Sequence, residues 1–197
     1  MKRLLAAAAL STALTTALVA LPLTAQAAPV AYKLDPAHTA VVFVVDHLGF
    51  SKAVGRFNTV AGELSFDKDA AEKSALTVSI DTASVDTNHA KRDEHLKSPD
   101  FFNVKEFPKL TFKSTKIEKT GDRTGKLHGD LTLLGVTKPV ILDVTFNKDG
   151  VSPASKLETV GFSARGTIKR SDFGMKYGVP NVGDDIQLII ESEAVKG

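Results

Sequence analysis

In many segments after residue 40, apolar and polar residues alternate with a period of two. Leu127 and Leu131, for example, lie on one side of this alternation, and His128 and Asp130 lie on the other. Successive side chains of a β-strand point to opposite faces, so each such segment predicts a strand with one apolar and one largely polar face. The pattern recurs in about eight segments, which are residues 40–46, 63–66, 76–81, 110–113, 126–133, 140–146, 162–169 and 186–190.

One segment, residues 88–98, has the composition of a helix. Asn88 can cap its first turn, and Pro99 ends it. The predicted fold class is therefore all-β with one short helix. Antiparallel strands joined by short turns favour an up-and-down barrel, which leaves no exposed sheet edge. A β-sandwich would show the same alternation, so the pattern alone does not separate the two architectures.

Residues 1–27 have the three parts of a secretory signal peptide. Lys2 and Arg3 form a basic start, residues 4–23 carry no charge, and residues 25–27 form an A-x-A cleavage site. The uncharged run is long enough to span a bilayer, but Pro22 and the cleavage site favour removal after Ala27. We therefore expect export to the periplasm and a mature domain, residues 28–197, that is not an integral membrane protein.

The charge balance excludes one class of partner. Of the 25 Lys and Arg residues, Lys2 and Arg3 belong to the expected signal peptide, which leaves 23 basic residues against 23 Asp and Glu. A neutral domain has no charge excess to attract nucleic acid. The chain has no cysteine, so neither a disulfide nor a thiol ligand or nucleophile is available.

Five histidines raise the question of catalysis or metal binding. His38 and His47 are nine residues apart, an odd spacing that points them to opposite faces of a regular strand. His89 and Asp93 are i,i+4 neighbours on the predicted helix, but the sequence supplies no further ligands nearby. No nucleophile elbow or phosphate-binding glycine motif is present. We therefore expect no metal site, no catalytic residues and no enzymatic activity.

Phenylalanine is the more informative residue. Eleven of the thirteen aromatic residues are Phe, and most of them are expected to fill the core. Phe101 and Phe102 lie beside the predicted helix, where they could plug or line an opening. Arg92 and His95 share one helical face. They could anchor a headgroup at that opening, or they could simply form surface ion pairs.

Several motifs together resemble the YceI family. Residues 32–39, with Asp35 and His38, are similar to its opening, and residues 92–102 match its most specific motif. Thr39 stands where the family often has Ser, and Leu134 stands where many members have His. The resemblance extends over essentially the whole mature chain through residues 55–57, 62–64, 84–87, 107–108, 112–114, 129–133, 135–140 and 170–175.

The resemblance implies a lipocalin-like antiparallel barrel of about eight strands that holds a polyisoprenoid, such as an isoprenoid quinone, or another long-chain lipid in a central tunnel. It implies no covalent cofactor and leaves a homodimer open. On this hypothesis the mouth of the tunnel is formed by Arg92, His95, Phe101 and Phe102. Its walls are formed by Val41, Phe43, Val45, Phe57, Phe112, Leu131, Leu133 and Phe173.

Two alternatives remain. The first is an enzyme that acts on a quinone or lipid headgroup, with His38, His47 or His95 as acid/base groups. The second is a non-catalytic stress-response scaffold with a filled core. A barrel supports many functions, so the fold alone does not choose between them.

Overall fold

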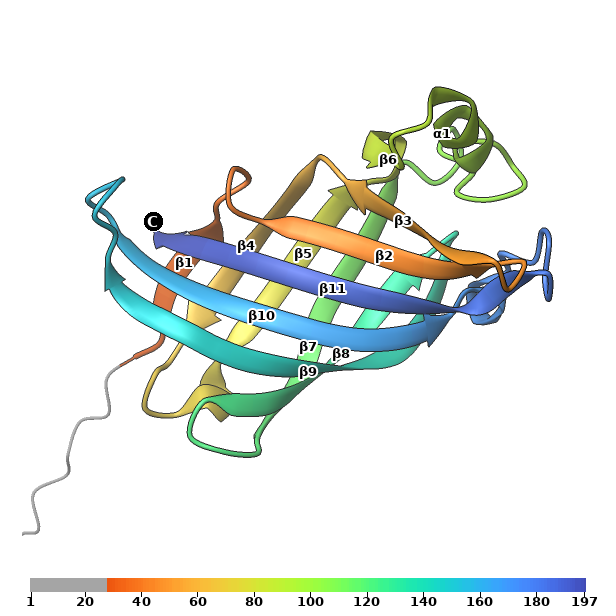
Figure 1. The fold of residues 1–197 in the computed structure, drawn as a ribbon. Helices are drawn as coiled ribbons and strands as arrows, with labels where there is room; N and C mark the ends of the chain where they lie inside the picture. Colours follow the sequence, from red (N-terminus) through yellow and green to blue (C-terminus); the bar gives the residue numbers. More distant parts are fainter. Residues whose placement is uncertain (1–27) are drawn as a thin grey trace, which may run out of the picture.

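The computed structural model describes residues 28–197, and the expected signal peptide lies outside this part of the chain. The described residues form one antiparallel sheet and one α-helix, α1 (Ala90–Leu96) (Figure 1). The strands are β1 (Val30–Leu34), β2 (Ala40–His47), β3 (Ser51–Phe57), β4 (Val60–Phe66), β5 (Ala75–Asp81), β6 (Val85–Asp86), β7 (Lys109–Lys119), β8 (Thr124–Leu133), β9 (Val136–Val151), β10 (Glu158–Lys169) and β11 (Val182–Lys196).

The sheet closes on itself. The order of hydrogen-bonded strands is β1-β4-β5-β7-β8-β9-β10-β11, and β11 pairs again with β1. Eight strands therefore form a closed ring, which confirms the all-β, lipocalin-like barrel. The sandwich alternative is wrong for the described residues, because the strands form a single closed sheet.

Two positions of the ring are each built from two strands. The first strand pairs with the last residues of β11, 194–196, whereas β2 pairs with residues 186–191 and 182 of the same strand. In the same way, β3 pairs with β2, and β4 pairs with β1. The segments β1–β2 and β3–β4 are therefore each bent and run along the barrel wall. The strands β2 and β3 extend this wall toward α1 (Figure 1).

The helix lies within the predicted range but begins later. Asn88 is not its cap: it adopts a positive φ of 59°, and its backbone N–H donates to Asp86. His89 caps the helix instead, because its Nδ1 accepts a hydrogen bond from the backbone N–H of Arg92 at 3.2 Å. The helix follows β6 and precedes β7, so it lies at the end of the barrel where β7 begins.

The apolar side chains that alternate along the strands point into the barrel. Together with side chains from the α1 end, they form one main buried cluster that includes Phe57, Phe112, Leu131 and Phe173. Among residues 28–197, no helix is long and apolar enough to cross a bilayer.

Candidate functional site

The barrel contains a cavity of about 680 Å³, a volume typical of small-molecule sites. Its middle is lined by apolar side chains from many strands, which include five of the predicted wall residues: Val41, Phe43, Phe57, Phe112 and Leu131. The rest of this wall is equally apolar and comprises Leu34, Val60, Leu64, Leu76, Val78, Ile80, Leu110, Ile117, Leu127, Val140, Leu142, Val144, Ala164, Ile168, Leu188 and Ile190.

Three phenylalanines line the cavity near one end and contact one another. The ring centroids of Phe66, Phe146 and Phe162 lie 5.3 to 5.6 Å from one another, and all three side chains line the cavity. We refer to Phe66, Phe146 and Phe162 as the aromatic collar. Aromatic pairs at this separation attract one another beyond simple area burial. The sequence alone favoured a place in the core for most phenylalanines, because it does not show which of them lie near an opening.

Charged residues form the rim of the cavity beyond the aromatic collar. Arg123 lies over the ring of Phe146, 5.5 Å from its centroid, and its Nε donates to the Phe146 carbonyl at 2.9 Å. Lys126 pairs with Asp143 at 2.8 Å, and this hydrogen bond raises the pKa of the Lys126 ammonium group. The other charged residues of the rim are Lys68, Asp69, Glu72, Lys119, Asp122, Lys148 and Asp149. The rim carries both signs and so does not by itself select an anion.

The rim lies at the end of the barrel away from α1. It is built from the β4–β5 and β7–β8 connections and the end of β9. The helix precedes Lys109, the first residue of β7, whereas the rim begins at Lys119, the last residue of β7. The helix and the rim therefore lie at opposite ends of this strand. A strand of that length spans about 35 Å.

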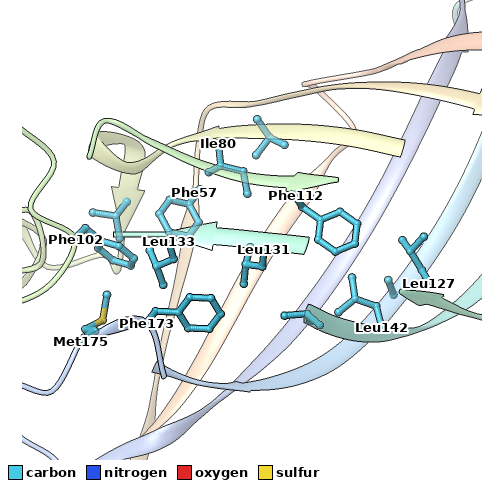
Figure 2. Packing of buried hydrophobic residues seen from close by; sticks show 14 residues of the cluster. Phe57, Ile80, Phe102, Phe112, Leu127, Leu131, Leu133, Leu142, Phe173 and Met175 are labelled. Carbon is cyan, nitrogen blue, oxygen red and sulfur yellow. The ribbon is translucent and has the colours of Figure 1, made fainter. Parts of the chain in front are cut away.

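The α1 end is filled with side chains. Figure 2 shows Phe57, Phe102, Leu133, Phe173 and Met175 gathered together, with Leu127 and Leu142 farther along the barrel. Phe102 packs edge-on against Phe57 at 5.4 Å between centroids. We refer to Phe102, Leu133, Phe173 and Met175 as the plug.

The structure therefore places the four predicted mouth residues away from the opening. Phe102 is buried in the plug, and Arg92 donates to the hydroxyl and the carbonyl of Thr87, both at 2.7 Å. His95 pairs with Asp100 at 2.8 Å and contacts the rings of Phe101 and Tyr177. None of the four lines the cavity. These side chains contact neighbouring residues at the α1 end, whereas the rim forms at the opposite end of β7.

Three predicted wall residues also lie outside the lining. Leu133 and Phe173 belong to the plug, where they are 4% and 2% exposed. Val45 is partly buried near the end of β2. Alternation correctly gave the inward face, but it could not show how far along the barrel the cavity extends.

The histidines considered as acid/base groups lie at separate places. His38 is in the β1–β2 turn, His47 is exposed at the end of β2, and His95 is on α1. None of the three lines the apolar cavity. The hydrogen bond that His38 donates to the Asp35 carboxylate raises the pKa of His38, and nearby Glu193 adds to the effect.

Comparison with known proteins identifies the family. The profile of the YceI-like domain matches residues 32–194, which is most of the chain. The chain belongs to the YceI family.

Two relatives match this chain over its full length. A UPF0312 protein of Pseudomonas putida is 40% identical over 198 residues, which cover all of this chain and 98% of the relative. A UPF0312 protein of Pseudomonas aeruginosa is 38% identical and covers 100% of this chain and 99% of the relative.

Solved structures share the barrel. The YceI protein of Campylobacter jejuni is 38% identical and superposes with a TM-score of 0.70 over 77% of this chain and 90% of its own. BcnA of Burkholderia cenocepacia is 26% identical, with a TM-score of 0.74 over 81% of this chain and 98% of its own. A polyisoprenoid binding domain from Saccharophagus degradans has a TM-score of 0.66 at 16% identity and covers 85% of this chain and 99% of its own. At 16% identity, the similarity to the Saccharophagus degradans domain shows a shared fold only.

Proposed function

We propose that this YceI protein binds a long-chain lipid of the polyisoprenoid class and carries it through the periplasm. The observation that carries the proposal is the apolar cavity of about 680 Å³, which opens at a charged rim and ends at the plug. An apolar tail would lie along the wall, and a polar headgroup would stay at the rim. The polyisoprenoid binding domain of Saccharophagus degradans, which has the same fold, supports this choice of ligand class.

The energetics favour a tail over a polar ligand. Each buried CH₂ contributes about 0.8 kcal/mol, so affinity should rise about fourfold per CH₂ until the cavity is full. The apolar middle of the wall offers no charged group to a sugar or a nucleotide. A ligand of this kind is nearly insoluble in water, which is the reason that it needs a carrier.

The periplasmic location rests on the signal-peptide pattern of residues 1–27. The proposal includes no chemical step, because His38, His47 and His95 lie outside the cavity. A carrier needs only an enclosed apolar space and an opening through which the tail can pass.

The experiment is a displacement assay. A fluorescent polyene probe bound to the mature protein is titrated with isoprenoid alcohols of 10, 15 and 20 carbons and with longer polyprenols. We expect affinity to increase with chain length and then to level off once the tail reaches the plug. Equal affinities for short and long chains would contradict a tail-binding cavity.

A matched pair of variants localises the site. Val41→Thr places a hydroxyl in the cavity wall without changing its shape, and Val54→Thr makes the same change at an exposed position. Covering an unpaired hydroxyl with an alkyl tail costs about 1–3 kcal/mol, which corresponds to roughly 5- to 150-fold weaker binding for Val41→Thr. We expect no change for Val54→Thr. Similar effects in both variants would place the ligand elsewhere.

A further inference from the structure

A second group of side chains lies on the outer side of the barrel, where the chain passes from β1 to β2. Both strands pair with β11, and the turn between them crosses Glu193. The backbone N–H of Asp35 donates to the Glu193 carbonyl at 2.9 Å, and the N–H of Glu193 donates to the His38 carbonyl at 3.3 Å. The Asp35–His38 turn and Glu193, which are far apart in the sequence, are thus held together by the main chain, independently of their side chains.

Their side chains converge as well. Each residue offers one atom that could bind a metal ion. These atoms of Asp35, His38 and Glu193 all lie within 4.8 Å of one another. Asp35 Oδ2 and His38 Nδ1 share a hydrogen bond at 2.7 Å, and Asp35 Oδ1 accepts from the N–H of Ala37 at 2.9 Å. Tetrahedral ligands of a zinc ion stand about 3.4 Å apart at bond lengths near 2.1 Å. Shifts of about 1 Å or less in the side chains would therefore bring all three atoms to a common ion.

One of the two carboxylates in this group is available to bind a metal ion. Within residues 28–197, the carboxylate of Glu193 makes no hydrogen bond and no ion pair with Lys or Arg. The nearby acids differ, because Glu191 pairs with Arg165 at 2.5 Å and Asp149 pairs with Lys68 at 3.4 Å. Asp35 and Glu193 are partly buried, so their negative charge is only partly screened by water.

Space for the remaining ligands is present beside the group. His38 and Glu193 line a surface hollow of about 330 Å³, together with Thr159, Gly161 and Ser192. The side chain of His38 is 60% exposed, so water can reach an ion bound to it. A metal ion held by three protein atoms would complete its coordination with water, as open zinc sites do.

We propose that Asp35, His38 and Glu193 bind a divalent transition-metal ion of the zinc type on the outer wall of the barrel. One imidazole nitrogen and two carboxylate oxygens form a ligand set that Zn²⁺ accepts. The ion replaces the proton shared by Asp35 and His38 and joins the β1–β2 turn to β11. Spacings between residues close in the sequence predicted no metal site, because Glu193 comes from the other end of the chain.

The test uses the mature protein without an affinity tag, treated with a chelator and then dialysed. Isothermal titration with ZnCl₂ should show one saturable site per chain. His38→Gln and Glu193→Gln should weaken binding at least tenfold, and His47→Gln, a change at an exposed histidine of β2, should leave it unchanged. Because Zn²⁺ would bind only the folded state at this site, it should also raise the melting temperature of the wild type more than that of His38→Gln.

A measurement on the unmodified protein guards against variants that fail to fold. In a ¹H–¹³C spectrum of the imidazole Cε1 groups, Zn²⁺ should shift His38 and leave His47, His89, His95 and His128 in place. Absence of binding at millimolar Zn²⁺, unchanged binding by His38→Gln, or shifts confined to other histidines would each overturn the proposal. None of the three ligand residues lines the lipid cavity, so failure of either proposal leaves the other standing.

Discussion

The ring of Phe43 lies directly over Gly55 on the neighbouring strand. The two residues are cross-strand partners in β2 and β3, and a Cβ atom added at Gly55 would lie 2.2 Å from Cζ of Phe43. Phe112 covers Gly129 in the same way, also at 2.2 Å. In both pairs, the missing side chain lets an aromatic ring lie flat against the wall. The glycines therefore help to keep the lumen open.

Gly55→Ala should destabilise the barrel and narrow the cavity. The added methyl group forces the Phe43 ring inward, because the nearest atoms leave no room for it. Overpacking of this kind costs about 1–3 kcal/mol. We expect a lower urea midpoint and weaker binding of the polyene probe. Gly161→Ala is the control, since its nearest neighbour is 3.8 Å away, and an equal effect there would contradict the interpretation.

Phe173→Ala should extend the cavity into the plug. The side chain is 2% exposed, so its loss should cost about 3–5 kcal/mol of folding stability. The space that it leaves continues the lumen beyond its present end. We expect the chain length at which polyprenol affinity levels off to increase. If the plateau stays at the wild-type length, the plug does not set the depth of the site.

Phe162→Ala should open the aromatic collar. Two ring contacts, with Phe66 and Phe146, are lost where these side chains line the cavity near the rim. We expect faster release of a bound lipid in stopped-flow transfer to vesicles, with a loss of about 1–3 kcal/mol in stability. Phe50→Ala removes a ring that is 90% exposed at the β2–β3 turn and should change neither quantity. A release rate unchanged by Phe162→Ala would show that the collar does not limit exit.

Asp184 should make stability depend on pH in acid. Its carboxylate accepts hydrogen bonds from the Ser171 hydroxyl at 2.7 Å and the Ser171 N–H at 2.9 Å, and these bonds lower its pKa below the usual value near 3.8. A lowered folded-state pKa adds stability that is complete well above pH 3.8 and is lost as the pH falls through the folded-state pKa. The urea midpoint of Asp184→Asn should be lower at neutral pH and should fall less on acidification. Parallel curves for the two proteins would rule out this role.

The alternation of the sequence predicted the barrel well, because strands that bury one face must alternate. It missed β1, β3 and β6, for different reasons. A strand of two residues, such as β6, is too short for an alternation to show. β1 is only five residues long, and the inward positions of β3 include Ala53 and Gly55, which are too small to look like a core face. The need for Gly55 is visible only when Phe43 is placed opposite it.

The candidate site was predicted only in part. Val41, Phe43 and Phe112 could be recognised as inward-facing from their strands alone. The position of the opening could not, because the β7–β8 turn and the end of β9 meet only in the closed barrel. Arg92 and His95 were attractive as mouth residues for their charge, but charge does not tell which end of a strand is open.

The most direct test of the lipid-binding account is native mass spectrometry of the protein, purified without detergent from the cells that produce it. The account predicts a complex with one long-chain lipid per chain, whose mass and fragments identify an isoprenoid tail, and a weaker complex for Val41→Thr than for Val54→Thr. A protein that carries no lipid, and that takes up none when offered polyprenols in vesicles, would contradict it.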